Sequence, residues 1–320
     1  MRPIIAAQGL RKRFGDRTAL DGVDLTVAAG TVHGVLGPNG AGKTTAVRIL
    51  TTLLKLDDDN AGGRAEVAGF DVMTRPDQVR AHIGLVGQNA AVDEVLSARQ
   101  NLELFGRLYH LGSRDARARA TELLDRFGLA DTGNKAVKQF SGGMRRRLDL
   151  AASLILRPRV LFLDEPTTGL DPRGRNEVWE AVRALVRDGT TVLLTTQYLD
   201  EADQLASAVS VVDHGRVIAE GSPATLKARL GGDRLDVVLH DVAALPAAAE
   251  VVTRVAGEPA TVDEDNRMVS APVTDPLGAL GDAVRALREA GLGVEDVALR
   301  RPTLDEVFLH LTGDKKEVAA

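Results

Sequence analysis

The sequence predicts an α/β fold, in which parallel strands alternate with helices, followed by a smaller α+β domain. Short apolar runs at residues 32–36, 160–163 and 192–195 alternate with amphipathic segments, as in β-α-β units. A glycine-rich segment, residues 37–45, separates the first run from a helical one. A third observation, a shift in charge near residue 232, indicates the second domain, and a chain of 320 residues is long enough for two.

The elements of the first part follow from local patterns. Residues 32–36 are predicted to form a strand that enters a glycine-rich turn, and a helix is predicted from residue 43 to 53. Residues 160–163 are apolar throughout, which suits a strand buried on both faces of a sheet. The amphipathic segment 176–186 connects this strand to a similar one at 192–195.

Two further stretches depart from that alternation. From residue 97 to 127 apolar residues follow helical spacing with no strand between them, which predicts a helical subdomain at about 89–157. Beyond residue 232 the predicted order is strand, helix, two short strands, helix and strand, at 235–239, 245–255, around 263–266, 277–290 and 294–299. That order is similar to a small ferredoxin-like βαββαβ unit.

Charge places the boundary between the two parts. Residues 233–320 contain 17 acidic and 9 basic residues, whereas the rest of the chain contains 28 and 31. The paired glycines Gly231-Gly232 favour a linker at the same place. We therefore predict one domain at 1–230 and an accessory domain at 233–320.

Composition excludes several classes of protein. The chain contains no cysteine, which excludes disulfide frameworks, thiolate metal sites and cysteine nucleophiles. No apolar run approaches the roughly 18 residues that span a bilayer, and the N-terminal run at residues 4–7 is too short for a signal peptide. Aromatic residues make up 3%, which argues against stacking platforms for single-stranded nucleic acid. We expect residence in the cytosol.

The strongest local signal is the segment 37–45, which fills the phosphate-loop pattern G-x-x-x-x-G-K-[ST]. Its residues are Gly37, Pro38, Asn39, Gly40, Ala41, Gly42, Lys43, Thr44 and Thr45. Glycines let backbone N–H groups turn toward phosphate oxygens, and the helix N-terminus adds partial positive charge. Lys43 is predicted to reach the β- and γ-phosphates, and the Thr44 hydroxyl to bind Mg²⁺. The segment predicts a nucleotide-binding site.

An acidic pair follows the buried strand at 160–163. Asp164 stands where a carboxylate is needed for the Mg²⁺ of a bound nucleotide. Glu165, one residue further on, can polarise a water molecule near the γ-phosphate, as a hydrolase requires. On its own the pair could also be a helix N-cap, but beside a phosphate loop it predicts hydrolysis.

Ser141, Gly142, Gly143 and Met144 open a helical run between the helical stretch and the acidic strand. Taken alone, the three residues Ser141 to Gly143 are as typical of a plain helix cap with a turn as of a functional motif. Their order relative to the phosphate loop and the acidic pair resembles the ATP-binding subunit of ABC transporters. In that family the Ser-Gly-Gly signature contacts the γ-phosphate of ATP bound by the partner subunit, so the resemblance implies a homodimer of cassettes with two sandwiched Mg²⁺-ATP molecules.

The resemblance assigns roles to four further residues. Gln88 matches the glutamine that touches Mg²⁺ and the attacking water, and Asp171 lies in the loop that crosses the dimer interface. Phe14 matches an aromatic residue that stacks on adenine, for which core packing is the alternative. Gln197 stands where the family normally has a histidine near the γ-phosphate. It can donate a hydrogen bond there but carries no charge.

Two segments, 195–203 and 301–313, are similar to the daunorubicin-resistance exporter ATPase subfamily, in which a glutamine at the position of Gln197 is typical. The resemblance implies a peripheral ATPase on the cytoplasmic face of the cell membrane. Such an ATPase pairs with a separate permease that exports hydrophobic drugs or lipids. The cargo cannot be read from this chain, because cargo contacts belong to the permease.

The main alternative is a soluble ABC ATPase of translation or DNA repair, which shares the same site. Many of those carry two cassettes or a long coiled coil, and this sequence has neither. A GTPase switch would need N-K-x-D, and the segment 134–137 lacks the aspartate. No nucleic-acid partner is expected, since the run Arg145-Arg146-Arg147 is interpreted as lying near phosphate or on a solvated helix face.

Overall fold

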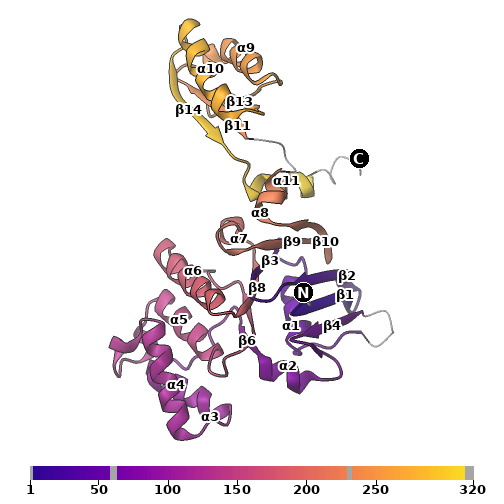
Figure 1. Cartoon of the computed structure of the whole chain (residues 1–320), viewed down its shortest axis with the longest axis vertical. Helices are drawn as coiled ribbons and strands as arrows, with labels where there is room; N and C mark the ends of the chain where they lie inside the picture. Colours follow the sequence, from indigo (N-terminus) through magenta and orange to yellow (C-terminus); the bar gives the residue numbers. More distant parts are fainter. Residues whose placement is uncertain (1–2, 58–62, 229–232, 314–320) are drawn as a thin grey trace. The chain divides into compact units, whose positions relative to one another are not determined.

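The computed structural model describes residues 3–57, 63–228 and 233–313 (Figure 1). The chain forms two compact units, residues 1–223 and 224–320. The predicted linker at Gly231-Gly232 lies outside the described residues, and the domain limits drawn from it remain a prediction.

The described residues of the first unit form two sheets, which confirms the predicted α/β fold. Its larger sheet consists of β3 (Val32–Leu36), β6 (Ile83–Val86), β7 (Val160–Asp164), β8 (Thr191–Thr196), β9 (Ala208–Asp213) and β10 (Arg216–Gly221). The strands lie in the order β10-β9-β3-β8-β7-β6. All neighbouring pairs are parallel except β9 and β10, which are antiparallel. The smaller sheet is antiparallel, with the order β2-β1-β4-β5, and consists of β1 (Ile5–Phe14), β2 (Arg17–Val27), β4 (Arg64–Val67) and β5 (Phe70–Asp71). The sequence analysis did not predict this second sheet.

Seven α-helices accompany these sheets in the described part of the first unit: α1 (Lys43–Leu50), α2 (Pro76–His82), α3 (Ala98–Leu108), α4 (Ser113–Arg126), α5 (Gly142–Ser153), α6 (Pro172–Arg187) and α7 (Leu199–Leu205). Two 3-10 turns, Ala130–Thr132 and Val137–Gln139, lie between α4 and α5. Helix α1 ends at Leu50, earlier than predicted, because Thr52 adopts a left-handed backbone with φ of 64°. Helices α3 and α4 lie away from the sheets, with α5 beside them (Figure 1).

The central strands are buried on both faces, which explains why they are apolar throughout. Every residue of β3, β7 and β8 is buried. Along β7, Leu161 and Leu163 pack into a core with helices α4, α5 and α6, whereas Val160 and Phe162 pack into a core with α1 and the antiparallel sheet. Burial on both faces fixes the strand register, and with it the side chains that follow each strand.

The second unit confirms the predicted βαββαβ order. It contains β11 (Arg234–Leu239), α9 (Leu245–Ala256), β12 (Thr261–Asp263), β13 (Met268–Pro272), α10 (Pro276–Glu289) and β14 (Val294–Arg300), with a short 3-10 turn, Val242–Ala244, before α9. The antiparallel sheet order β12-β13-β11-β14 is the ferredoxin-like arrangement. Helix α8 (Pro223–Ala228) begins at the division between the units, and α11 (Leu304–Gly313) follows the last strand.

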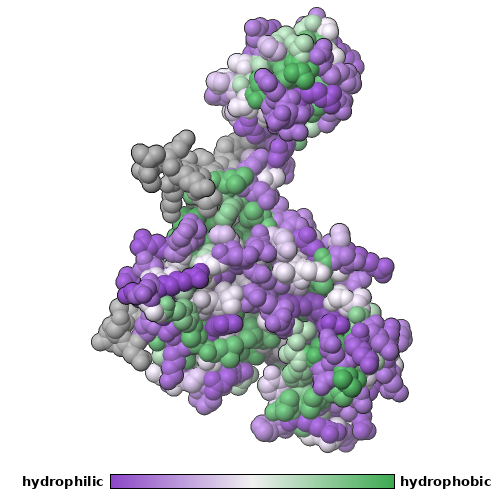
Figure 2. Space-filling model, turned by 180° about the vertical axis from the view of Figure 1, so that it is seen from behind, coloured by the Kyte–Doolittle hydropathy of each residue, from purple (hydrophilic) through white to green (hydrophobic). Residues whose placement is uncertain are grey.

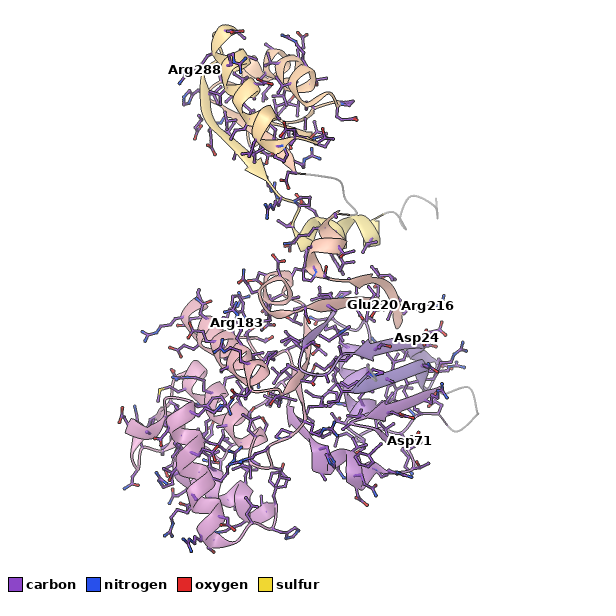
Figure 3. The ribbon with its side chains drawn as sticks, in the orientation of Figure 1. Asp24, Asp71, Arg183, Arg216, Glu220 and Arg288 are labelled. Atoms are coloured by element: carbon purple, nitrogen blue, oxygen red, sulfur yellow. The ribbon has the colours of Figure 1, made fainter. Side chains whose placement is uncertain are left out.

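On the face seen in Figure 2, both units carry many hydrophilic side chains. The face of the second unit seen in Figure 2 is mostly hydrophilic around a small hydrophobic patch. Charged side chains such as Arg288 on α10 and Asp24 on β2 are exposed on the outside of their elements (Figure 3). Among the described residues, no helix combines the length and the apolar character needed to cross a bilayer.

One buried titratable group links the fold to pH. His33 on β3 is 2% exposed, and its Nε2 lies 2.9 Å from Ser210 Oγ on β9. Burial lowers the pKa of His33 to about 4.

We predict that His33→Gln makes the fold less sensitive to acid. The unfolded chain takes up a proton on His33 near its ordinary pKa, whereas the folded chain does so only near pH 4, so stability is lost as pH falls between these values. From about pH 7.5 to about pH 5, the parent should lose about 2 kcal/mol more free energy of unfolding than His33→Gln does. Urea unfolding at both pH values measures this difference, and equal losses in the two proteins would contradict the prediction.

Candidate nucleotide-binding site

The loop between β3 and α1 can be built only with glycine at two positions. A Cβ on Gly37 would lie 2.2 Å from the Val212 carbonyl oxygen, and one on Gly42 would lie 2.5 Å from that of Ala19. Gly42 also has a φ of 109° and precedes the first turn of α1. The loop therefore packs closely against its neighbours, while the N-terminus of α1 borders a cavity, an arrangement that attracts anions.

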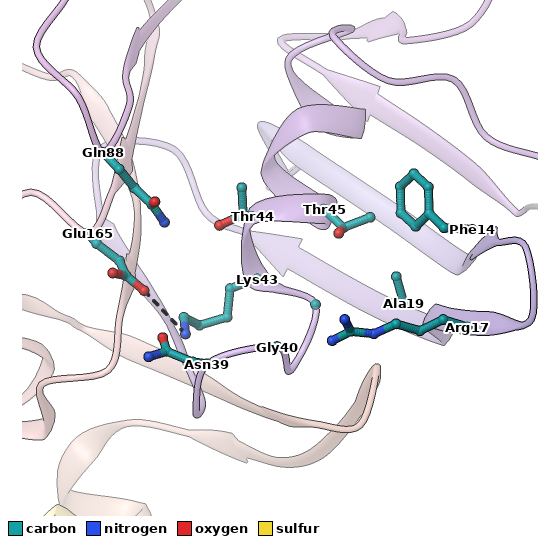
Figure 4. Close-up of a pocket in the computed structure, with 11 residues that line it drawn as sticks. Phe14, Arg17, Ala19, Asn39, Gly40, Lys43, Thr44, Thr45, Gln88 and Glu165 are labelled. Atoms are coloured by element: carbon teal, nitrogen blue, oxygen red, sulfur yellow. Dashed lines mark ion pairs between the residues drawn. The ribbon is translucent and has the colours of Figure 1, made fainter.

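A cavity of about 350 Å³ lies over this loop (Figure 4). Its lining includes nine of the predicted site residues: Phe14, Asn39, Gly40, Gly42, Lys43, Thr44, Thr45, Gln88 and Glu165. Gly37, Pro38 and Ala41 belong to the loop but do not line the cavity. Arg17 and Ala19 of β2 also line it, and the sequence analysis missed both because β2 itself was not predicted.

Lys43 is held in place by its own loop. Its side chain is 4% exposed, and Nζ donates hydrogen bonds to the carbonyl oxygens of Gly37 (2.8 Å) and Pro38 (3.1 Å). The same Nζ lies 3.5 Å from Glu165 Oε1, the ion pair dashed in Figure 4. A buried ammonium group beside backbone N–H groups is suited to bind the phosphates of a nucleotide.

Asp164 joins two segments at the carboxyl edge of the sheet. Thr44 Oγ1, at the start of α1, donates to Asp164 Oδ1 at 3.2 Å. Thr195 Oγ1, on the neighbouring strand β8, donates to the same oxygen at 2.6 Å. Gln88 follows β6 and lines the same cavity. Hydroxyl, carboxylate and amide oxygens are the ligands that Mg²⁺ prefers, so Thr44, Asp164 and Gln88 fit this ion.

Glu165 has a strained backbone that directs its side chain into the cavity. Its φ is 51°, which costs a residue with a side chain roughly 1–2 kcal/mol. The backbone N–H donates to the Thr195 carbonyl oxygen at 3.0 Å, and Thr168 Oγ1 donates to the Glu165 carboxylate at 3.5 Å. No local propensity in the sequence indicates this conformation, which Glu165 shares with six other non-glycine residues among those the structure describes. Glu165 is the one of these that lines the cavity.

Phe14 lies at the open end of the cavity. It is 51% exposed, so it does not pack in the core, the alternative that the sequence left open. Lys12 Nζ lies 5.8 Å from the centre of its ring. An exposed aromatic ring at the edge of a phosphate-binding cavity is suited to stack on a nucleobase.

The Ser-Gly-Gly segment lies in a different cavity. Ser141 Oγ caps α5 by accepting a hydrogen bond from the Met144 N–H at 3.2 Å, and Asp171 caps α6 by accepting one from Gly174 at 2.8 Å. A cavity of about 570 Å³ is lined by Ser141, Gly142, Gly143, Met144, Arg147, Gly169, Leu170, Asp171, Arg173, Gly174 and Glu177. The structure thus places the Ser-Gly-Gly segment and Asp171 in one cavity. None of these residues lines the phosphate-loop cavity. Gln197 lines neither cavity.

We predict that Gly42→Ala is more destabilising than a positive φ alone explains. The added methyl group would meet the Ala19 carbonyl oxygen, so the loop must move, and the loss in free energy of unfolding should reach about 3 kcal/mol or more. Gly69→Ala is the matched control, since Gly69 has a φ of 89° and open space around it. Its expected loss is about 1 kcal/mol. Urea unfolding compares the two variants, and similar losses would show that packing at Gly42 has no role.

Comparison with known proteins identifies the family. The family model "ABC transporter" matches residues 20–168. The daunorubicin resistance ATP-binding protein DrrA3 of Streptomyces coeruleorubidus is 67% identical, with 98% of this chain and 97% of that protein covered. The doxorubicin resistance ATP-binding protein DrrA of Mycobacterium tuberculosis (strain ATCC 25618 / H37Rv) is 45% identical, with 98% and 95% covered. The Nod factor export ATP-binding protein I of Ralstonia nicotianae is 37% identical, with 97% and 94% covered.

Solved structures agree with this assignment. CbiO1 from Clostridium perfringens, part of an ABC transporter complex, superposes with a TM-score of 0.65 at 28% identity, covering 72% of this chain and 92% of that one. An ATP-binding cassette of an ABC transporter in its ADP conformation gives a TM-score of 0.63 at 25% identity, with 69% and 92% covered. These matches confirm the resemblance found in the sequence. The chain therefore belongs to the ATP-hydrolysing subunits of ABC transporters, in the drug-resistance and export family that contains the daunorubicin resistance ATP-binding proteins.

Proposed function

We propose that two copies of this chain close around two Mg²⁺-ATP molecules and drive a separate membrane permease. The observation that carries this proposal is the separation of the two cavities. Ser141, Gly142 and Gly143 present a helix N-terminus in one cavity, whereas Lys43 and Glu165 line the other. The signature segment of a second copy would supply the missing wall of each nucleotide site.

Within each site, the proposed roles follow the contacts of the side chains. Lys43 and the loop N–H groups would bind the phosphates, and the Phe14 ring would stack on adenine. Thr44, Asp164 and Gln88 would hold Mg²⁺, which neutralises charge on the phosphates when it is bound.

The hydrolytic step is assigned to Glu165. Its carboxylate lines the cavity beside the Lys43 ammonium group, where it would orient and deprotonate the attacking water. Gln197, two residues beyond Thr195 at the same sheet edge, would donate a neutral hydrogen bond to the γ-phosphate. Asp171 would contact the second copy across the interface, because it lines the signature cavity.

The names of the relatives support an export function over a non-transport ATPase. Proteins matched over nearly their whole length are named for daunorubicin or doxorubicin resistance and for Nod factor export. We infer that the cargo is a hydrophobic drug or a lipid, and that the chain acts at the cytoplasmic face of the membrane bound to its permease. A soluble ATPase of translation or DNA repair remains the alternative that a transport assay decides.

We predict that Glu165→Gln retains ATP binding and loses hydrolysis. Glutamine keeps the size of the side chain but cannot accept the proton of water, so kcat should fall roughly 100-fold or more. The variant should elute from gel filtration as a dimer with ATP and as a monomer without it. Glu103→Gln is the control, since Glu103 lines neither cavity and pairs with Arg117 at 3.9 Å. Hydrolysis by Glu165→Gln at the parental rate would refute the assignment.

A transport assay tests the function of the whole complex. Membrane vesicles that contain this chain and its permease should show ATP-dependent movement of daunorubicin, because the ATPase cycle supplies the energy. Vesicles with Glu165→Gln should contain the same amount of both subunits and show no movement. Transport that is unchanged by this variant would contradict the proposal. Full ATPase activity without transport of any drug or lipid would favour the non-transport alternative.

A further inference from the structure

Helix α5 carries a buried ion pair close behind the nucleotide site. Arg146 and Asp149 are one turn apart, 7% and 4% exposed, and Arg146 Nη1 lies 3.3 Å from Asp149 Oδ2. Burial lowers the pKa of Arg146 and raises the pKa of Asp149, because each charge has lost water. The interpretation of Arg145-Arg146-Arg147 as a solvated or phosphate-facing run is therefore wrong for Arg146. Buried charges are retained where they have further hydrogen-bond partners.

Arg146 binds the backbone directly after Glu165. Its Nε donates to the Pro166 carbonyl oxygen at 2.7 Å. Its Nη2 lies 3.4 Å from the Glu165 carbonyl oxygen and 3.5 Å from that of Asp164. The planar guanidinium group thus holds the turn that carries Glu165 at several points, which the single ammonium group of a lysine could not reproduce.

The same pair holds the segment that carries Gln88 on both sides. Arg146 Nη1 donates to the Gly87 carbonyl oxygen at 2.7 Å, immediately before Gln88. Asp149 Oδ1 accepts a hydrogen bond from the Ala91 N–H at 2.9 Å, three residues after it. The two ends of this short irregular segment are therefore tied to one turn of α5.

We propose that Arg146 and Asp149 are positioning residues for the ATPase site: they hold the backbone around Gln88 and after Glu165 so that both side chains stay in the nucleotide cavity. This inference rests on the proposed function, in which these two side chains act on Mg²⁺ and on water. Because the pair belongs to the helix that Ser141 opens, it ties the signature segment to the groups that perform hydrolysis.

The geometry separates this role from nucleotide binding. Within the described residues, none of the hydrogen bonds or ion pairs of Arg146 and Asp149 goes to the phosphate loop 37–45. The contacts of Arg146 go instead to the backbone around Glu165, which has a left-handed and unfavourable conformation. Its N–H is bound by Thr195, and the carbonyl side is bound by Arg146. Loss of Arg146 should therefore lower kcat far more than it lowers the affinity for ATP.

The test compares Arg146→Lys and Asp149→Asn with a matched control in the full chain. Arg119→Lys is the control, since Arg119 is also buried and donates to the Leu154 (2.5 Å) and Ile155 (3.3 Å) carbonyl oxygens just beyond α5. ATP affinity is measured with a fluorescent ATP analogue, kcat by phosphate release, and folding by thermal denaturation.

We expect Arg146→Lys to lower kcat roughly 10- to 100-fold with affinity changed less than about threefold. Asp149→Asn keeps an oxygen for Ala91 but loses the charge, so its kcat should fall less, and it serves as the test should Arg146→Lys fail to fold. Arg119→Lys should lower the melting temperature and keep the parental kcat. A parental kcat in folded Arg146→Lys or Asp149→Asn, or an equal loss of kcat in Arg119→Lys, would overturn the proposal.

The parallel measurement on Glu165→Gln keeps the two proposals apart. If Glu165→Gln hydrolyses ATP at the parental rate, the role of Glu165 in the proposed function is refuted. If Glu165→Gln is inactive while folded Arg146→Lys keeps the parental kcat, the proposed function stands and the positioning role is refuted.

Discussion

Asp164 accepts hydrogen bonds from Thr44 and Thr195, and these two bonds join the start of α1, the end of β7 and the end of β8. They can form because β3, β8 and β7 are adjacent and parallel, so their carboxyl ends meet at one edge of the sheet. A register slip of one residue would turn Asp164 to the opposite face. Because both faces of β7 are buried among apolar residues, such a slip is unfavourable. The packing of the core therefore determines where the Asp164 side chain lies.

Helix α5 contacts the residues at the same edge of the sheet through Arg146. The sheet holds the Glu165 N–H through Thr195, and α5 holds the following carbonyl groups through Arg146. Glu165 thus lies where two rigid elements meet, and its unfavourable backbone is stable because both of its neighbours are bound. In this arrangement the position of the Glu165 backbone depends on the buried Arg146 as well as on the neighbouring strand.

The sequence predicted those parts of the molecule whose chemistry is contained in a short segment. The phosphate loop could be recognised because glycines, Lys43 and Thr44 are required at fixed spacing, and β7 and β8 because they are apolar throughout. The antiparallel sheet was missed because β1 mixes polar and apolar residues and has several register shifts against β2. The burial of Arg146 was missed because the three consecutive arginines are alike in sequence. Successive residues of a helix point in different directions, and of the three only Arg146 is on the buried side of α5.

The pairing of Arg146 with Asp149 also restricts how this chain can vary at these two positions. Replacing the arginine alone leaves a buried carboxylate without its counter-charge, and replacing the aspartate alone leaves a buried guanidinium group in the same situation. Each single exchange carries this cost, so descendants of this chain are expected to change the two positions together. The two residues should therefore be inherited as a unit, and a lineage that carries other residues there must hold its Gln88 segment by different means.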